Sequence, residues 1–585
     1  MRSKCNHYKG YVLNWDLTAL YKDKNALDSD LMDAKNRATN FEHVCKGKLK
    51  ELHVNEFLES IREYESINEK LGRIMTYAFL KFATNSDNGS FYAKYQQEQS
   101  NISEHLLFFE LEFNKLPKPK QEELIASIPH YKYFLESLVE EKPYQLSQKE
   151  ERILLKKDIT SGSAFSRLFD EHFSRLSFRY EGKNLSEEEI LSKLQDPSRE
   201  VRQNVANIFT KGLKPHQPLL GYIFNMIKTD LASECELRGY KSAEQPRHID
   251  NKITQKSVDA LVKSAEDSFY LVQDYYTLKA KLLGLDTLYE YDRYAPLEES
   301  VSEYDFERSK NIVLKAFADF NPKFHEIASM AFEEGWIDVF PQNKKRGGAF
   351  SHPATPSTHP YVLLNHTNTR RDLFTLAHEL GHAIHQYLSR GVGYLASDTP
   401  LTTSETASVF AEMLAFDAIK EHLSLEEKRS LYASKIEDIF STLYRQINFT
   451  TFERKVHAHE GELDLSTFNR YWMEESQKMF GNSITLSANY HLWWSYIPHF
   501  IHSPFYCYAY SYGQLLVLAL YGLYKKSDKA LFVQNYTSFL AAGGSQSPKE
   551  LISKFGFDIE DEQFWQLGIG EIKSILDEFK GMCDA

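Results

Sequence analysis

The sequence contains few cysteines, and they are not arranged for cross-linking or for metal binding. Cys5, Cys45, Cys235, Cys507 and Cys583 are odd in number, lie far apart and include no C-x-x-C pair. These features indicate neither a disulfide framework nor a zinc site built from thiolates. Thiols that stay reduced are typical of the cytosol, so we expect a cytoplasmic protein.

The sequence also lacks a long apolar run. The longest one, residues 515–524, is about half as long as the roughly 20 residues that span a bilayer, so it predicts a buried helix. Residues 1–7 lead into a polar, charged stretch without the apolar core of a secretory signal. We therefore expect neither export nor attachment to a membrane.

Positive charge is scarcer than negative charge. The 69 Lys and Arg residues and the 82 Asp and Glu residues leave a formal net charge of −13, so the surface repels phosphate backbones on average. No nucleic-acid partner is expected. The 585 residues, 42% of them apolar and 26% charged, exclude a disordered or collagen-like chain. This length allows three or four domains of about 150 residues, or fewer larger ones.

Apolar residues at helical spacing are abundant. They dominate residues 28–145, as in Phe57, Ile61 and Tyr64, and they recur up to about residue 335 and from 370 to the end. Residues 178–185 read as a short extended or turn segment before a capping box, and residues 337–368 are expected to hold the few strands. The predicted fold class is therefore mainly α. We predict a helical N-terminal domain, residues 1–184, and a second domain, residues 185–585.

The segment that carries chemistry is an H-E-x-x-H motif in a helical pattern, formed by His378, Glu379 and His382. At 3.6 residues per turn the two histidines lie on adjacent turns of one face, so both imidazoles can reach one zinc ion. Glu379 flanks that ion. It is the predicted general base, which takes a proton from a zinc-activated water and passes it to the leaving amine.

The context of the motif favours a metal site over two histidines that merely pack or cap. Four apolar residues give the helix a buried side and leave both histidines on another face; they are Leu373, Leu376, Leu380 and Ile384. His385 shares the face of His378, but we expect it to be structural, because a catalytic zinc generally has three protein ligands.

The third ligand is expected further along the chain. Leu388 stands where metzincins place a third histidine, which excludes that class. The next helical segment offers Glu405 as the ligand, and Glu412, two turns later, as a residue that orients a histidine. The alternative is that Thr402 and Glu405 form an ordinary capping box and that Glu412 is a solvated surface charge.

Several further segments accompany the metal-binding motif in a fixed order along nearly the whole chain. They are residues 15–17 (WDL), 164–169 (AFSRLF), 194–202 (LQDPSREVR), 281–285 (KLLGL), 291–292 (YD), 345–350 (KRGGAF) and 405–408 (ETAS). With these segments, the sequence resembles the oligoendopeptidase F branch of the thimet oligopeptidase-like zinc metallopeptidases. The resemblance implies a helical, two-lobed shell around a deep substrate channel, with a small β-sheet near the zinc helix. It also implies one Zn²⁺ per chain, held by His378, His382 and Glu405, with Glu379 as the base.

The resemblance extends to a histidine followed by spaced tyrosines near the C-terminus. In the family such residues contact substrate and oxyanion, and here His499, Tyr506 and Tyr510 match by spacing. Two alternatives stay open. His502 also precedes the tyrosines, and a helix in this segment turns either the pair Tyr506/Tyr510 or the pair Tyr508/Tyr512 away from a cleft.

Upstream of the motif, two features suggest how a peptide is bound. Residues 361–366 form a short β-type run whose exposed edge is expected to pair with an extended peptide. Gly347 and Gly348 either let a loop approach the substrate or form a plain turn.

The predicted function is a cytoplasmic zinc endopeptidase that hydrolyses internal bonds of short peptides. Its expected partners are oligopeptides; no oligomeric state is predicted. The first alternative is a dipeptidyl carboxypeptidase or zinc carboxypeptidase on a related helical scaffold. The second is a catalytically inactive peptide-binding protein. Manganese or cobalt are alternatives to zinc, because similar ligands bind several divalent ions.

Overall fold

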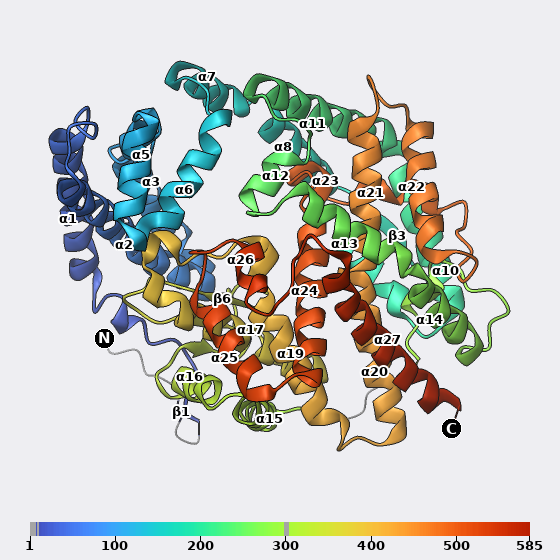
Figure 1. Cartoon of the computed structure of the whole chain (residues 1–585). Coiled ribbons are helices and arrows are strands. Elements are labelled where there is room, and N and C mark those ends of the chain that lie inside the picture. The colour runs from blue at the N-terminus through green and yellow to red at the C-terminus, as the bar shows by residue number, and fades with distance from the viewer. Residues whose placement is uncertain (1–6, 9–10, 298–302, 585) are drawn as a thin grey trace. The chain divides into compact units, whose positions relative to one another are not determined.

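The computed structural model describes residues 7–8, 11–297 and 303–584 (Figure 1). Cys5 and residues 1–6 of the amino-terminal stretch lie outside the described residues. Helices make up most of the chain, and the strands form three small sheets. The predicted mainly α class is therefore confirmed, whereas the two-lobed shell around a channel stays a prediction.

The chain divides into two compact units, each assembled from three separated segments. Unit 1 contains Met1–Lys142, Val301–Glu421 and Ser527–Phe555, and unit 2 contains Pro143–Ser300, His422–Lys526 and Gly556–Ala585. The junction between residues 184 and 185 lies inside a strand of unit 2, β4 (Lys183–Leu185). The division of the sequence into residues 1–184 and 185–585 stays a prediction, since compact units of this kind combine distant segments.

Unit 1 begins with a group of amphipathic helices. Their aromatic side chains form the centre of one hydrophobic core, where Phe109 stacks on Phe57 and Tyr64 with ring centroids 5.6 and 4.7 Å apart. The helices of unit 1 are α1 (Lys24–Cys45), α2 (Val54–Thr84), α3 (Gly89–Ser103), α4 (Phe108–Lys115), α5 (Lys118–Ser127), α6 (Lys132–Glu141), α15 (Phe306–Phe320), α16 (Pro322–Glu333), α17 (Arg370–Ser389), α18 (Leu401–Ser404), α19 (Thr406–Lys420), α25 (Lys529–Ala541) and α26 (Pro548–Ser553).

A three-stranded sheet in unit 1 lies beside α17, as predicted for residues 337–368. Its strands are β5 (Ile337–Asp338), β6 (Phe350–His352) and β7 (Tyr361–Leu363), in the order β5-β7-β6. β7 is parallel to β5 and antiparallel to β6, so it is the central strand. The predicted exposed edge on residues 361–366 is therefore wrong for residues 361–363, because both sides of β7 are already paired.

Unit 2 packs around a core rich in tryptophan. Trp472 and Trp493 are buried, and their indole N–H groups donate to the carbonyl of Tyr490 (3.0 Å) and to Thr210 Oγ1 (2.9 Å). The helices are α7 (Gln148–Asp158), α8 (Gly162–Phe173), α9 (Glu187–Ser192), α10 (Arg199–Leu213), α11 (Gln217–Arg238), α12 (Gln245–Asp250), α13 (Gln255–Asp267), α14 (Phe269–Leu282), α20 (Leu425–Thr442), α21 (Tyr444–Ala458), α22 (Leu465–Phe480), α23 (His499–His502), α24 (Cys507–Lys526) and α27 (Glu562–Asp584).

The other strands form hairpin-like pairs. β3 (Phe178–Tyr180) pairs with β4 in the segment that was expected to be extended, and β1 (His7–Tyr8) pairs with β2 (Tyr11–Val12). The capping box predicted after residue 185 is present, because Ser186 and Glu189 bond each other's backbone. The apolar run 515–524 lies in α24, where Leu515 to Gly522 are buried as predicted.

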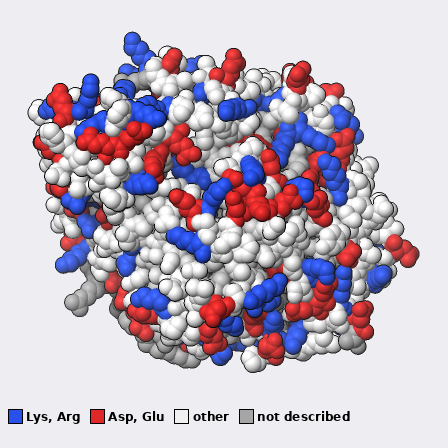
Figure 2. All heavy atoms as spheres, viewed as in Figure 1, with Lys and Arg blue, Asp and Glu red and all other residues white. Residues whose placement is uncertain are grey.

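No helix in the described part of the chain is long and apolar enough to cross a membrane. Acidic and basic side chains are interspersed on the face shown in Figure 2, in keeping with the composition.

Candidate functional site

Helix α17 has a defined start and a defined buried side. Thr369 is its N-cap, and a capping box joins it to Asp372: the Thr369 N–H donates to Asp372 Oδ2 (2.8 Å), and the Asp372 N–H donates to Thr369 Oγ1 (3.3 Å). Leu373, Leu376, Leu380 and Ile384 are fully buried. This burial sets the rotation of the helix and leaves His378 and His382 partly exposed, with 25% and 18% of their side chains accessible.

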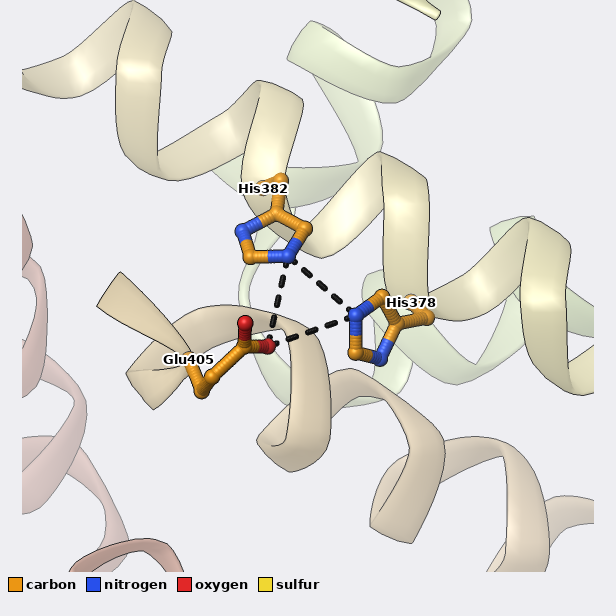
Figure 3. Close-up of side chains that lie close together, drawn as sticks. All are labelled: His378, His382 and Glu405. Atoms are coloured by element: carbon orange, nitrogen blue, oxygen red, sulfur yellow. Dashed lines mark hydrogen bonds and ion pairs between the residues drawn. The ribbon is translucent and has the colours of Figure 1, made fainter. Parts of the chain in front are cut away.

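The two histidines and Glu405 converge on one point within unit 1 (Figure 3). The Nε2 atoms of His378 and His382 are 3.2 Å apart, and each lies 3.3 Å from Glu405 Oε2. In a tetrahedral site with zinc–ligand distances of about 2.0–2.2 Å, ligand atoms are about 3.3–3.6 Å from one another. Two imidazole nitrogens and one carboxylate oxygen at this spacing therefore fit a tetrahedral divalent cation such as zinc.

Glu405 stands at the junction of α18 and α19. α18 begins after Pro400, and Glu405 is the N-cap of α19 without a side-chain cap bond, so the alternative of a Thr402/Glu405 capping box is wrong. Instead, Ser408 Oγ donates to Glu405 Oε2 (2.7 Å) and orients the carboxylate. Sequence reasoning gave Ser408 no role, although its position three residues after Glu405 was a usable signal.

The close approach of α17 and α19 depends on a glycine that sequence reasoning also left without a role. A Cβ built on Gly381 would meet the carbonyl oxygen of Ala407 at 2.5 Å and the Cα of Ser408 at 2.7 Å. Only a residue without a side chain allows this backbone contact. Gly381 thus brings the start of α19, and with it Glu405, within reach of the two histidines.

Glu412 contacts His378 on the ring nitrogen that points away from Glu405 and His382, as predicted. Its Oε1 lies 2.7 Å from His378 Nδ1, so it holds a proton on Nδ1, and Nε2 is the nitrogen that faces the candidate metal position. Burial alone would lower the pKa of His378, but its hydrogen bonds to Glu405 and Glu412 raise that pKa well above its usual value. Burial would raise the pKa of Glu405, and the two histidines lower it well below its usual value. The carboxylates of Glu405 and Glu412 thus attract positive charge at this point, which is a proton on His378 when no metal is bound.

Glu379 and His385 lie on α17 outside the triad of His378, His382 and Glu405. Glu379 is 7% exposed, and this burial raises the pKa of its carboxyl group. His385 is buried as well, and burial lowers its pKa to about 3. A neutral, buried imidazole agrees with the structural role predicted for His385.

The second predicted group lies together in unit 2. His499 Nε2 is 3.4 Å from the hydroxyl oxygen of Tyr510, and the ring centroids of Tyr506 and Tyr510 are 5.0 Å apart. His502 points elsewhere, since its Nε2 is 2.8 Å from Asp170 Oδ1. Of the two histidines, His499 is therefore the one that accompanies the tyrosines.

The alternative tyrosine pair is buried and already bonded. The hydroxyl of Tyr508 lies 2.9 Å from His248 Nδ1 and accepts from Asn251 Nδ2 at 2.9 Å, and that of Tyr512 lies 2.8 Å from Ser257 Oγ. Tyr506 and Tyr510 are partly exposed. The structure thus separates the two pairs as the helical spacing predicted.

A buried acid holds the turn before Tyr506, and sequence reasoning missed it. Phe505 has a φ of 58°, an uncommon conformation for a bulky residue, and its N–H donates to Glu453 Oε1 at 2.8 Å. Glu453 is fully buried, and this raises its pKa to about 8. The sequence around Glu453 holds no motif that marks it.

Comparison with known proteins identifies the family. The family model described as Peptidase family M3 matches residues 192–571, and the one described as Oligopeptidase F matches residues 112–178. The chain belongs to peptidase family M3. The match covers more than half of the chain and includes His378, His382 and Glu405.

The individual relatives span nearly the whole chain. Oligopeptidase PepF of Bacillus subtilis is 28% identical over 97% of this chain and 86% of its own length. An oligoendopeptidase F homolog of Lactococcus lactis is 28% identical over 98% of this chain and 97% of its own length. The predicted resemblance to the oligoendopeptidase F branch is therefore confirmed.

Solved structures share the fold of this M3 family member. One from Chlamydophila abortus has a TM-score of 0.87 at 23% identity and covers 97% of this chain and 98% of the other. Oligoendopeptidase-F from Enterococcus faecium has a TM-score of 0.71 at 20% identity, covering 96% and 99%.

Proposed function

We propose that this M3 peptidase is a zinc-dependent endopeptidase that hydrolyses internal bonds of short peptides in the cytosol. The observation that carries the proposal is the triad of His378, His382 and Glu405, whose ligand atoms are 3.2–3.3 Å apart with Glu379 on the same helix. The names of the relatives, oligopeptidase and oligoendopeptidase, support peptide substrates and cleavage of internal bonds. The buried thiols of Cys45, Cys235 and Cys507 suit a reducing compartment.

The triad would hold one zinc ion per chain. When bound, zinc polarises the scissile carbonyl and makes water more acidic. Glu412 and Ser408 keep the ligand residues in place, because Glu412 Oε1 lies 2.7 Å from His378 Nδ1 and Ser408 Oγ donates to Glu405 Oε2 at 2.7 Å. Glu379 accepts a proton from the attacking water on its carboxylate and then gives that proton to the leaving amine. Its burial raises the pKa of the carboxyl group, which makes the carboxylate a better proton acceptor.

His499, Tyr506 and Tyr510 are the proposed donors to the substrate and its oxyanion. Such donors lower the barrier when they point at the oxygen on which negative charge develops. Their partial exposure and mutual contacts support this role, and the pairing of His502 with Asp170 favours His499 over His502. The metal ligands belong to unit 1 and these donors to unit 2, so their action on one substrate is part of the proposal.

Two measurements test the proposal. Internally quenched peptides that are blocked at both ends should be cleaved, since an exopeptidase of the dipeptidyl carboxypeptidase or carboxypeptidase type needs a free terminus. Removal of the metal with a chelator should abolish cleavage, and metal analysis should find one zinc per chain rather than manganese or cobalt. Large folded proteins should not be cleaved.

Glu379→Gln separates an enzyme from an inactive peptide-binding protein. The variant should keep its zinc and lose roughly a hundredfold or more of turnover, because it lacks the proton acceptor. Equal turnover in wild type and variant would remove Glu379 from the mechanism. If zinc-loaded wild type leaves the blocked peptides uncleaved, the result favours one of the two alternatives, an exopeptidase or an inactive peptide-binding protein.

A further inference from the structure

Two arginines of unit 2, Arg293 and Arg445, have no carboxylate partner among the described residues. Arg293 is 7% exposed and belongs to the short 3-10 helix Asp292–Tyr294, and Arg445 is partly exposed in the first turn of α21. Arginine stays charged in proteins, and a buried charge is normally paired. Elsewhere in unit 2 this rule holds: Arg202 pairs with Asp292 at 3.0 Å, and Arg454 pairs with Asp259 at 3.0 Å.

The two guanidinium groups bond to tyrosine hydroxyls instead. Arg293 Nη2 donates to Tyr294, and Arg445 Nη2 donates to Tyr496 at 3.0 Å. The Nε atoms of both arginines are buried without a hydrogen-bond partner among the described residues. A hydroxyl that accepts from arginine still has its own proton to donate. The cluster therefore presents two guanidinium Nε–H donors that have no acceptor within the described chain.

Glu290, an acid close to Arg293 in the sequence, forms no ion pair with either arginine among the described residues. The carboxylate of Glu290 is engaged by Ser487, which donates from its N–H (2.8 Å) and its Oγ (2.6 Å). Burial raises the pKa of Glu290, which weakens its negative charge. Burial would also raise the pKa of Tyr294, but the charges of Arg293 and Arg445 outweigh it and the pKa lies below its usual value. Both arginines thus act on the same hydroxyl.

The cluster is near the proposed donor group of unit 2. The pKa of His499 is lowered by burial and, next, by the charge of Arg445. His499 Nδ1 is a further buried nitrogen without a hydrogen-bond partner in the described chain. Tyr294, Tyr496 and Arg445 are each partly exposed, so these residues retain some contact with solvent.

We infer that Arg293, Arg445 and their tyrosine partners form a site for a single small anion. The anion is a carboxylate group of the peptide or a free halide, since either supplies the one negative acceptor that the donors lack. The carboxylate source rests on the proposed peptidase function, whereas the halide source does not. A bound peptide carboxylate would hold one end of a short substrate beside His499.

The halide source is tested on the full chain by thermal unfolding. Sodium bromide replaces sodium isethionate, which has a bulky anion, at constant ionic strength. The wild type should show a saturable rise of about 1–2 °C in its unfolding midpoint. Arg445→Met should remove the rise and Arg445→Lys should keep part of it, because lysine retains the charge.

The carboxylate source is tested without turnover. One uncleaved peptide, with either a free or an amidated C-terminus, is titrated calorimetrically into the zinc-loaded Glu379→Gln variant. The free carboxylate should bind about tenfold more tightly, as a charge-assisted hydrogen bond allows. Adding Arg445→Met should abolish this difference. Because neither test measures hydrolysis, an inactive protein with intact anion effects would contradict the proposed function and leave the anion site standing.

Arg454→Met is the matched control. Arg454 is a partly buried arginine that binds carboxylates, so its loss should lower stability and leave both anion effects in place. The site is supported if the bromide effect or the carboxylate effect occurs in the wild type and is lost in Arg445→Met or Arg293→Met. The effect that is lost identifies the anion as a halide or a peptide carboxylate. The inference is overturned if the wild type shows neither effect, or if both persist in these variants. If Arg293→Met fails to fold, the result for Arg445→Met alone decides whether the site exists, because Arg445 is partly exposed.

Discussion

Gly381 of α17 lies directly against the backbone of Ala407 at the start of α19, where a Cβ would be 2.5 Å from the Ala407 carbonyl oxygen. This contact joins the helix that carries two of the proposed metal ligands to Ala407, which lies two residues after the third, Glu405. The geometry of the triad therefore depends on a residue that has no side chain.

Gly381→Ala should push the two helices apart. We expect a loss of about 1–3 kcal/mol in the free energy of unfolding, because backbone rather than a flexible side chain must move. Metal affinity should fall with it, as Glu405 withdraws from the histidines. Competition with a chromogenic chelator measures the affinity, and denaturant titration measures the stability.

Gly391→Ala is the control for that change. Gly391 follows α17, and a Cβ there meets nothing within 4 Å. The control should keep wild-type metal affinity and stability. If Gly381→Ala behaves in the same way, the close contact with Ala407 does not set the ligand geometry.

Glu412 should matter for the metal although it is not a ligand. Glu412→Ala removes the acceptor that lies 2.7 Å from His378 Nδ1, so the imidazole loses its fixed orientation. Metal affinity should fall about 10–100-fold in Glu412→Ala. It should fall less in Glu412→Gln, because glutamine retains an acceptor oxygen. Glu421→Ala, at an exposed position just after α19, should leave affinity unchanged. An unaltered affinity in Glu412→Ala would exclude the orienting role.

Substitutions in the pair Tyr506/Tyr510 should affect catalysis, whereas substitutions in the pair Tyr508/Tyr512 should affect stability. Tyr506→Phe and Tyr510→Phe should lower kcat on a peptide substrate with little change in stability, because their hydroxyls are the proposed donors. Tyr508→Phe and Tyr512→Phe should cost about 1 kcal/mol of stability each, because buried hydrogen bonds are lost, and should leave kcat near that of the wild type. The reverse pattern would assign the donors to the other pair.

The histidines near these tyrosines make a similar comparison. His499→Ala should lower kcat, whereas His502→Ala should mainly remove an exposed contact with Asp170. Peptide hydrolysis by both variants under identical zinc loading is the measurement. A larger loss in His502→Ala would contradict the choice of His499.

Glu453 should make stability fall as pH rises. Burial raises its pKa to about 8, above the ordinary value near 4.5, with a smaller contribution in the same direction from Glu244 and an opposing one from Arg247. The folded state therefore holds a proton that the unfolded state has released. This group's contribution is complete below pH about 4.5, declines by up to about 1.4 kcal/mol per pH unit, and is lost once the pH passes about 8.

Glu453→Gln should remove this part of the slope. Glutamine mimics the protonated acid and keeps an acceptor for the Phe505 N–H. Denaturant titrations between pH 5 and 9 should show a flatter profile for the variant than for the wild type. Parallel profiles would show that Glu453 does not carry the raised pKa. Glu453→Leu, which lacks the acceptor, should also release the turn before Tyr506 and lower kcat.

Much of the candidate metal site was predictable from local pattern. Helical hydrogen bonding repeats every 3.6 residues, so the spacing of His378 and His382 and the apolar side of α17 follow from the sequence alone. The mainly α class and the strands in residues 337–368 follow from the same kind of pattern. Glu405 was a candidate ligand because it lies in the next helical segment. The alternative interpretation, a capping box with Thr402, rests on an equally local pattern, so the sequence alone did not distinguish the two.

Long-range packing settled the remaining questions, because it depends on which distant surfaces fit together. The contact between Gly381 and Ala407 brings Glu405 to the histidines, and the partners of Tyr508 and His502 distinguish buried or paired groups from partly exposed ones. No local pattern indicates that the charges of Arg293 and Arg445, which are far apart in the sequence, both act on Tyr294. Contacts of this kind form only when the whole unit folds, because they join segments that are far apart in the sequence and share no periodic pattern.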